Sequence, residues 1–359
     1  MNLVIIYTQH YYIMILHTYF FSGIVRILVD LERKPIDIYT MCRYYKRERW
    51  KGNAQSYRST FLNKKESIQI NTTKSKYKMF TKSTLLKRAI TNNARTCFFS
   101  TGRTPIVGGN WKLNAGNGTT YSEVETLVND LNNAPTPKSN VEIICAPPAL
   151  YLDRVNQGLD SSKFSVSAQN CYHENKGAYT GENSATMLKD LNINWTLIGH
   201  SERRDIFSET DDMLEKKITT ALDENLSVIA CCGEHKEDRE NGTTMNVLIP
   251  QLQAMVNGVA NSSSKSWDNV VIAYEPVWAI GTGLTATPEQ AQETHLNIRT
   301  WLKENVSESV ANAVRIQYGG SVNDENAKEL GNMADIDGFL VGGASLDAGK
   351  FSTIYHAFD

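Results

Sequence analysis

The chain has 359 residues, 41% of them hydrophobic, and its 37 Lys/Arg nearly balance its 39 Asp/Glu. This composition fits one or two globular domains with an ample core. The charge is divided unevenly, since the chain through Thr104 carries 19 Lys/Arg and 5 Asp/Glu, whereas residues 105–359 carry 18 and 34. The basic residues of the first part are scattered and lack a recognition motif or interleaved aromatic residues, which excludes a nucleic-acid partner.

The apolar character of the first 25 residues is one of two features of the N-terminal part. They carry no Lys, Arg, Asp or Glu and are rich in Ile, Tyr, Leu and Phe, which admits a signal-anchor or membrane-span interpretation. Gln9, His10 and His17 interrupt the run, however, and we expect no membrane association.

The second feature is the basic segment 79–104, which starts at Met79 and contains no acidic residue. Its helical wheel separates apolar from basic side chains, as in a mitochondrial transit peptide. We interpret residues 1–78 as a disordered basic extension or an artefact of gene prediction, with translation starting near Met79 and a mature matrix enzyme beginning near Ser100. The alternative is a disordered tail on a cytoplasmic protein.

From Pro105 onward, short apolar runs alternate with longer amphipathic segments, which is the pattern of a parallel α/β protein. Eight runs predict strands: "PIVGGN" near 105, "VEIICA" at 141, "FSVSAQ" at 164, "WTLIGH" at 195, "LSVIAC" at 226, "VVIAYE" at 270, "RIQYGG" at 315 and "GFLVGG" at 338. Eight strand–helix units in about 255 residues match the size of a (β/α)8 barrel. A doubly wound open sheet is the alternative, but no GxGxxG follows the first strand.

Amphipathic segments between these runs predict helices at Tyr121–Leu131, Asp212–Glu224, Met245–Val256 and Pro288–Asn305. The last of them has Thr287 as its expected N-cap and a proline at its first position, where the missing N–H costs nothing.

Cysteine usage indicates neither a metal nor a disulfide framework. The six cysteines include no CxxC pair and no dense regular spacing, although Cys231 and Cys232 are adjacent. We therefore expect reduced thiols in an intracellular protein and no zinc site.

Polar and glycine residues follow the predicted strands. In a barrel of this kind the catalytic groups lie at the carboxyl ends of the strands. The residues found there are Asn110, Lys112, Gln169, Asn170, His200, Glu202, Glu275, Gly319, Gly320, Ser321, Gly342 and Gly343. The sequence therefore predicts a functional site at one rim of the barrel.

Glu275 follows a buried apolar run and precedes Pro276, which fixes its own φ and restricts Glu275 to extended geometry. Gly281 and Gly283 come shortly after, and glycine adopts backbone angles closed to other residues. This stretch predicts a carboxylate on a rigid strand end followed by a hinged lid. The alternative is a carboxylate paired with a lysine and an ordinary strand-to-helix loop.

Six stretches, "GGNWKLN", "TGENS", "IGHSERR", "AYEPVWAIGTG", "YGGSV" and "DGFLVGGASL", resemble the signature sequences of the triosephosphate isomerase family, in family order and with compatible spacing. The resemblance covers essentially all of residues 105–359. It implies a TIM barrel that interconverts dihydroxyacetone phosphate and D-glyceraldehyde 3-phosphate through an enediolate, in glycolysis and gluconeogenesis. It implies no cofactor and no metal.

The resemblance also implies roles for five residues. Glu275 would be the base that moves the proton, and His200 the neutral electrophile that polarises the carbonyl. Lys112 would supply a fixed positive charge near the oxyanion and the phosphate, with Asn110 donating to the same oxygen. Glu202 would orient Lys112 or take part in proton shuttling. Taken alone, a histidine at a strand end is more often structural, and a lysine such as Lys112 is more often a solvated surface residue; the surrounding motifs favour the functional roles.

Local chemistry agrees with a neutral His200, because residues 201–204 can open a helical turn whose free N–H groups disfavour an added positive charge. The phosphate needs donors without bulk, and glycine turns let backbone N–H groups converge on an anion. In the family pattern that role falls to Gly281, Ser321, Gly342 and Gly343.

The resemblance further divides the lid and implies an assembly. Residues 276–278 would be the first hinge, 279–281 the tip and 284–286 the second hinge. The long stretch "NCYHENKGAYTGEN" resembles the family's intersubunit loop, with Thr180 and Glu182 reaching a second copy, which implies a homodimer. An exposed loop of one subunit is the alternative.

Two other functional classes remain for comparison. Another phosphosugar enzyme on the same barrel could share the glycine phosphate site, but we would not expect it to carry "GHSERR" and "AYEPVW" together. A non-catalytic scaffold protein would be expected to have lost Glu275, His200 or Lys112, and all three are present.

Overall fold

The computed structural model describes residues 2–8, 11–20, 23–31, 102–116, 118, 120–280 and 285–359, with the backbone alone for the first three of these segments. The chain divides into two compact units, Met1–Lys82 and Ser83–Asp359. Each is described by itself below.

The first unit contains a small antiparallel sheet in the order β1-β2-β3, made of β1 (Asn2–Thr8), β2 (Tyr11–Phe20) and β3 (Gly23–Leu31). Its strands coincide with the apolar, β-branched start of the sequence. Of the predicted transit peptide the structure describes only residues 102–104, and most of the predicted extension lies outside the described residues. Within the part that the structure describes, no helix is long and apolar enough to cross a membrane.

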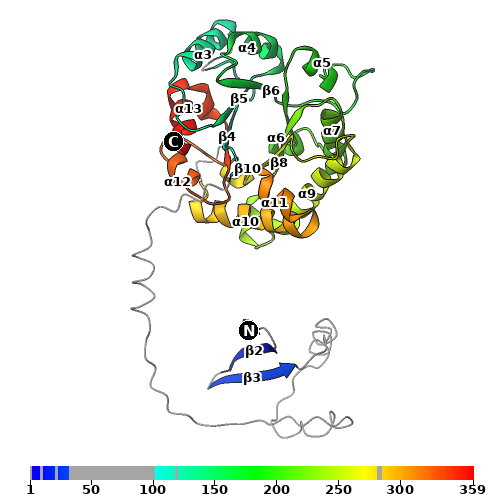
Figure 1. The fold of residues 1–359 in the computed structure, drawn as a ribbon, viewed down its shortest axis with the longest axis vertical. Helices are drawn as coiled ribbons and strands as arrows, with labels where there is room; N and C mark the ends of the chain where they lie inside the picture. Colours follow the sequence, from blue (N-terminus) through cyan, green and yellow to red (C-terminus); the bar gives the residue numbers. More distant parts are fainter. Residues whose placement is uncertain are drawn as a thin grey trace. The chain divides into compact units, whose positions relative to one another are not determined.

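The second unit is a closed barrel of parallel strands in the order β10-β11-β4-β5-β6-β7-β8-β9 (Figure 1). The eight predicted runs are confirmed as β4 (Ile106–Asn110), β5 (Glu142–Ala146), β6 (Phe164–Ala168), β7 (Trp195–Ile198), β8 (Ser227–Cys232), β9 (Val270–Tyr274), β10 (Arg315–Tyr318) and β11 (Gly338–Val341). Closure pairs the last strand with the first, Gly338 with Ile106. The open-sheet alternative is therefore wrong.

Helices surround the strands (Figure 1). They are α3 (Tyr121–Asn133), α4 (Leu152–Gly158), α5 (Ala185–Asp190), α6 (Ser201–Asp205), α7 (Asp211–Asp223), α8 (Lys236–Glu240), α9 (Thr244–Asn261), α10 (Pro288–Asn305), α11 (Glu308–Ala313), α12 (Ala327–Gly331) and α13 (Ala348–Tyr355), with short 3-10 turns η1 (Ala149–Tyr151), η2 (Val277–Ala279), η3 (Gly343–Leu346) and η4 (His356–Phe358). The start predicted for α10 is confirmed, since the Thr287 side chain accepts from the Gln290 N–H in a capping box.

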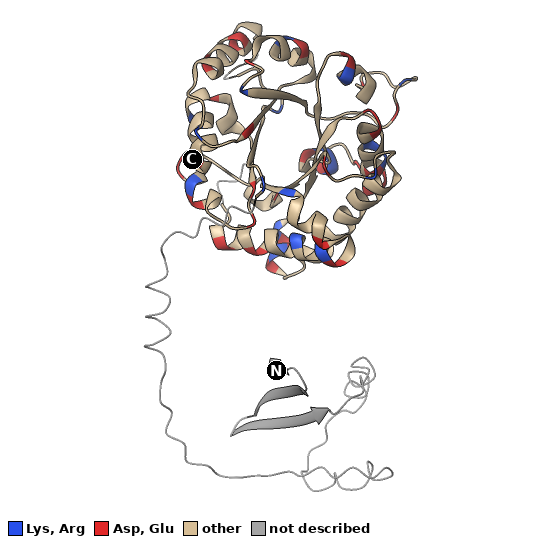
Figure 2. Cartoon of the chain, viewed as in Figure 1, with Lys and Arg blue, Asp and Glu red and all other residues tan. Residues whose placement is uncertain are grey.

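The strands are buried on both faces, which explains their unbroken apolar runs. On β5, Ile144 belongs to the cluster inside the barrel, whereas Ile143 and Cys145 pack in the layer between strands and helices. Lys, Arg, Asp and Glu lie mainly on the helices and loops around the strands (Figure 2). The interior of the barrel is thus a packed apolar core, and polar side chains that carry out chemistry have to lie at its rims.

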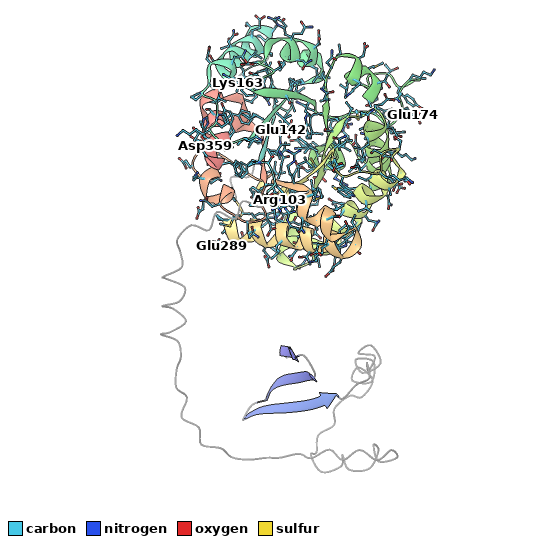
Figure 3. All side chains as sticks on the ribbon, viewed as in Figure 1. Arg103, Glu142, Lys163, Glu174, Glu289 and Asp359 are labelled. Carbon is cyan, nitrogen blue, oxygen red and sulfur yellow. The ribbon has the colours of Figure 1, made fainter. Side chains whose placement is uncertain are left out.

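Ion pairs close the end of the barrel where the strands begin. Arg103 donates to Asp337 Oδ1 at 2.6 Å and to the carbonyls of Asn312 and Ala334, each at 3.2 Å. Arg315, at the start of β10, pairs at 2.6 Å with Glu142, at the start of β5. Figure 3 labels Arg103 and Glu142. Arg103 is therefore part of the barrel, although it precedes the first predicted strand.

Candidate active site

His200 stands at the carboxyl end of β7, where the chain turns into α6. Gly199 takes a φ of +76°, and a Cβ built there would lie 2.2 Å from a Leu214 methyl, so the turn requires glycine. His200 caps α6, and its Nδ1 accepts the Glu202 N–H at 3.2 Å. A ring nitrogen that accepts a hydrogen bond carries no proton, so this imidazole is neutral with its proton on Nε2. The helical turn predicted after His200 is confirmed.

Glu275 follows β9, and its side chain is 2% exposed. Its Oε1 lies 3.2 Å from His200 Nε2, and its Oε2 accepts the Ser201 N–H at 3.0 Å. Its own N–H donates to the Cys232 carbonyl at 2.7 Å. Both carboxylate oxygens are therefore bound to the His200 turn, and the buried charge sits at the N-terminal end of α6.

Lys112 adopts a φ of +53°, in the left-handed region that is uncommon for a residue with a side chain. Neighbouring side chains hold it there, since its N–H donates to Asn110 Oδ1 at 3.0 Å and its carbonyl accepts from Gln169 Nε2 at 2.8 Å. Its Nζ lies 2.6 Å from Glu202 Oε1. Asn110 and Gln169 thus fix the backbone of Lys112, and Glu202 fixes its charge.

Three of the four residues expected at the phosphate lie in the described part of the chain, and Gly281 lies outside it. A Cβ built on Gly342 would come within 3.6 Å of Lys112 Cε, so this turn adjoins the lysine. A Cβ on Gly343 would meet no atom within 4 Å. The N–H and Oγ of Ser321 both donate to the Ala279 carbonyl, at 3.1 and 2.5 Å. In this state Ser321 binds the lid.

The first hinge of the predicted lid is held by Glu234, which the sequence reasoning missed. Its Oε1 accepts from Trp278 Nε1 and from the Tyr274 hydroxyl, each at 3.0 Å, and its backbone carbonyl accepts the Val277 N–H. Glu234 is fully buried, and burial raises the pKa of its carboxyl group. The only signal in the sequence was an acid shortly after strand β8.

Comparison with known proteins covers the whole of the barrel. A family model described as triosephosphate isomerase matches residues 105–358. The chain belongs to the triosephosphate isomerase family. Triosephosphate isomerase of Neurospora crassa is 52% identical over 241 residues, which cover 67% of this chain and 93% of that protein. A chloroplastic triosephosphate isomerase of Arabidopsis thaliana is 49% identical over 252 residues, covering 70% and 76%.

The family determines the reaction. Triosephosphate isomerases interconvert dihydroxyacetone phosphate and D-glyceraldehyde 3-phosphate, and this chain is an isomerase of that class with triose phosphates as substrates. The matched region coincides with the barrel and ends one residue before the last residue of the chain.

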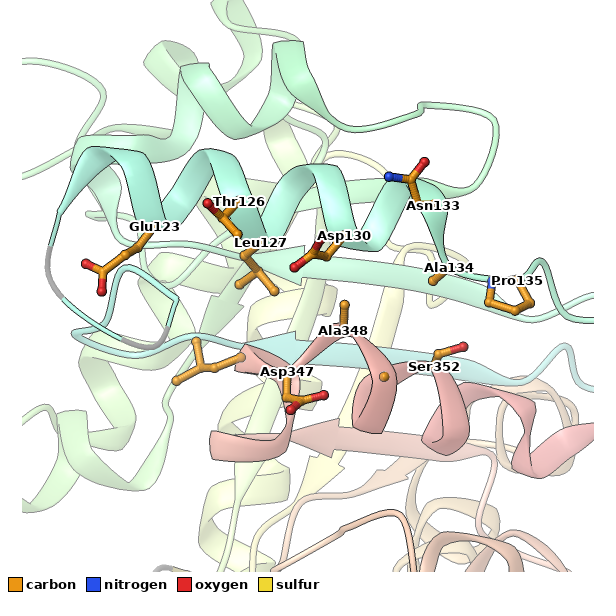
Figure 4. Close-up of a pocket in the computed structure, with 12 residues that line it drawn as sticks. Glu123, Thr126, Leu127, Asp130, Asn133, Ala134, Pro135, Asp347, Ala348 and Ser352 are labelled. Atoms are coloured by element: carbon orange, nitrogen blue, oxygen red, sulfur yellow. The ribbon is translucent and has the colours of Figure 1, made fainter.

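A cavity of about 590 Å³ lies away from this rim, between α3 and α13 (Figure 4). Leu127 and Ala348 line it together with the carboxylates of Glu123, Asp130 and Asp347. Three acids and no base in its lining would repel a phosphate ester. This cavity is therefore unsuited to triose phosphates, which leaves the rim that carries Lys112 as the candidate site.

Metal and thiol chemistry have little support in the described residues. Among them, no group of three or more His, Cys, Asp or Glu side chains is placed to hold a metal ion. Cys145, Cys171, Cys231 and Cys232 are buried free thiols. Burial raises the pKa of Cys145 and of Cys232 to about 12, so both are protonated at neutral pH.

Proposed function

We propose that Glu275 is the base of the isomerase, that His200 is its electrophile, and that Lys112 stabilises the oxyanion. The observation that carries this proposal is the 3.2 Å approach of Glu275 Oε1 to His200 Nε2, because it brings an acceptor for a carbon-bound proton beside a neutral donor for the carbonyl. Glu202 connects the pair to Lys112, since its N–H binds the His200 ring and its carboxylate binds the lysine.

The proton moves between two adjacent carbons of the substrate. Glu275 removes it from the carbon beside the carbonyl, and the Nε2–H of His200 stabilises the charge that develops on the carbonyl oxygen. The resulting enediolate takes the proton back from Glu275 on the neighbouring carbon. At the same time the hydroxyl proton of the first oxygen passes to the second, and His200 would relay it by giving up its Nε2 proton to one oxygen and taking the proton of the other. The 3.2 Å contact takes up the space between base and electrophile that a substrate needs, so catalysis requires Glu275 to leave His200 and Ser201.

Lys112 would act as a fixed cation, and the ion pair with Glu202 supports an orienting role for that acid. Asn110 Oδ1 accepts from Lys112, so its amide N–H groups remain oriented away from that bond and suited to donate to a substrate oxygen. Gly342, Gly343, Ser321 and Gly281 would bind the phosphate through backbone N–H groups. Ser321 becomes available only when its bonds to Ala279 open.

A coupled assay on the purified full chain tests the activity. Formation of glyceraldehyde 3-phosphate from dihydroxyacetone phosphate, with no added metal or cofactor, is the expected result. A folded protein with no turnover above the uncatalysed rate would refute the proposed function.

We propose a homodimer formed through the loop that carries Thr180 and Glu182. The loop has its own support, because the rings of Tyr172 and Tyr179 lie against each other with their centroids 4.6 Å apart, and the Tyr172 N–H donates to the Asn183 carbonyl at 2.8 Å. Thr180 is left exposed. Figure 3 labels Glu174 of this loop at the outer edge of the barrel.

Exposed apolar side chains on nearby loops support the same assembly. Leu113 is 92% exposed, Leu150 84%, Ile206 68% and Phe207 60%, and all four follow strands at the catalytic rim. Large apolar groups gathered at one side of a soluble domain indicate an interface. Sedimentation of the full chain should give the mass of two subunits at micromolar concentration. A single-subunit mass would refute the dimer.

We propose that residues 79–104 direct the barrel to the mitochondrial matrix, with residues 1–78 lying upstream of the effective start near Met79. The bonds of Arg103 to the barrel support removal of the leader before Gly102, near Ser100, because a later cut would release them. The Arabidopsis thaliana relative is named as chloroplastic. Residues 79–104 fused to a fluorescent protein should enter mitochondria and be shortened. A diffuse, uncut fusion would favour the cytoplasmic alternative.

A further inference from the structure

Two adjacent arginines follow Glu202 in the stretch "SERR", and the proposed reaction uses neither of them. Arg203 turns outward, where it binds Glu209 at 2.7 Å and lies 4.5 Å from the Phe207 ring. Arg204 turns toward the barrel, and its side chain is 15% exposed. The two side chains therefore have different surroundings despite their adjacency.

Arg204 binds three acceptors on three elements. Its Nε donates to the Gly199 carbonyl at 2.9 Å, its Nη2 to the Cys231 carbonyl at 3.2 Å and its Nη1 to Asp211 Oδ1 at 2.7 Å. These acceptors lie after β7, on β8 and at the start of α7. A planar guanidinium can serve acceptors in several fixed directions, which a lysine ammonium on its flexible stem cannot reproduce.

Each of the two carbonyls belongs to a segment that holds a reacting side chain. Gly199, with its φ of +76°, directly precedes His200 and sets the direction in which the imidazole leaves β7. Cys231 directly precedes Cys232, whose carbonyl accepts the Glu275 N–H at 2.7 Å. Arg204 therefore bonds the residue directly before the electrophile, and it also bonds the residue directly before the one that holds the backbone of the base.

We propose that Arg204 is a positioning residue that sets the placement of His200 relative to Glu275, anchored by Asp211. The inference deepens the proposed function and rests on it. Arg204 touches no substrate in this proposal. Its bonds hold the ends of β7 and β8 together, so that the imidazole and the backbone of the base keep the relative placement that a substrate between them requires.

A role in fold stability alone would give a different result. Loss of Arg204 would then lower the unfolding temperature and the amount of folded enzyme, while each folded molecule kept its turnover. A positioning role lowers kcat per folded site and leaves KM nearly unchanged, because the phosphate turns and Lys112 are not in contact with Arg204 in the bonds described above. It also changes the environment of the His200 ring.

The test compares Arg204→Lys with Arg315→Lys in the full chain. Arg315 is a matched control, since its side chain is 17% exposed and it forms one ion pair, with Glu142, at the opposite end of the barrel. We expect Arg204→Lys to lower kcat by about 10- to 100-fold with KM within about threefold, since a misplacement of about 1 Å costs about 100-fold. Arg315→Lys should keep kcat within about twofold.

Proton NMR supplies a signature independent of turnover. The Nε2 proton of His200, which faces Glu275 Oε1 at 3.2 Å, should give a downfield signal in the unmodified protein. That signal should shift or vanish in Arg204→Lys and persist in Arg315→Lys. If Arg204→Lys does not fold, Asp211→Asn takes its place as the test of the positioning role. This variant removes the negative charge that anchors the guanidinium but keeps an acceptor oxygen, and we expect its kcat to fall by about threefold or more.

A folded Arg204→Lys enzyme with unchanged kcat and an unchanged His200 signal overturns the inference, as does full kcat in Asp211→Asn when Arg204→Lys cannot be obtained. The unmodified chain and Glu275→Gln are assayed beside them. An inactive unmodified chain, or an active Glu275→Gln enzyme, overturns the proposed function. An active enzyme that depends on Glu275 but not on Arg204 overturns only the positioning role.

Discussion

Replacing Glu275 by Gln is the most direct perturbation of the proposed chemistry. The amide keeps the length and shape of the side chain but cannot take up a carbon-bound proton. General-base catalysis then disappears, and we expect kcat to fall by at least about a thousandfold, or roughly 4 kcal/mol of barrier. KM should change little, because Glu275 holds neither phosphate turn in the structure.

The structure also sets the expected cost in stability. The carboxylate accepts one hydrogen bond, from the Ser201 N–H, and its other oxygen lies 3.2 Å from His200 Nε2. A glutamine has one acceptor oxygen, so it can keep only one of these two contacts, and its amide N–H₂ then faces the other donor. Loss of one buried hydrogen bond costs about 1–3 kcal/mol. Relief of burying a charge offsets part of that cost, so the variant should fold.

The assay follows the coupled formation of glyceraldehyde 3-phosphate, with circular dichroism and sedimentation on the same preparation. Glu275→Asp is the control that restores a carboxylate at a shorter reach, and it should recover part of the lost rate. A folded Glu275→Gln protein that turns over within about tenfold of the unmodified chain would show that another group moves the proton. The base would then have to be sought elsewhere on the rim.

Three further outcomes are expected. Gly343→Val should raise KM and weaken the binding of phosphate-bearing enediolate mimics. The barrel should stay folded, because a Cβ at this position meets no atom within 4 Å. An unchanged inhibitor affinity would mean that the phosphate binds elsewhere. Thr180→Arg should shift sedimentation toward single subunits and reduce activity, which an unchanged dimer would contradict. Burial lowers the pKa of His295 from 6.5 to about 3. Below pH 6.5 the unfolded chain therefore takes up a proton at this residue while the folded chain does not, so the free energy of unfolding falls as the pH drops through 6.5. Between pH 7.5 and 5.0 the unmodified protein should lose about 2 kcal/mol per subunit more than His295→Phe, measured by urea unfolding, and equal losses would argue against a buried neutral imidazole.

Much of the fold could be read from local patterns. All eight strands were predicted within one or two residues of their observed bounds, because strands buried on both faces leave continuous apolar runs. The start of α10 was predicted to the residue from Thr287 and Pro288, since a cap depends on its own neighbours alone. The apolar start of the chain was judged only by its composition, and its strand pairing could not be read that way.

Some residues of the candidate site could likewise be recognised from local sequence, whereas others could not. Glu275, His200 and Lys112 were recognised because each stands in a short, distinctive stretch at a strand end. Glu234 and Arg204 were not, because their significance lies in what they touch. Glu234 binds a tryptophan 44 positions further along the chain, and a lone acid after a strand carries no signal of that contact.

The sequence by itself therefore determined the order of strands and helices, the family, and the residue types at one rim. Only the tertiary structure decided that Glu275 rests against His200 and the Ser201 N–H, 74 positions away, and that Glu202 holds Lys112, 90 positions away. Local patterns report what each residue prefers along its own strand or helix. Contacts between strand ends depend on closure of the barrel and on the register of parallel strands, which place these side chains within hydrogen-bonding distance only after the whole chain has folded.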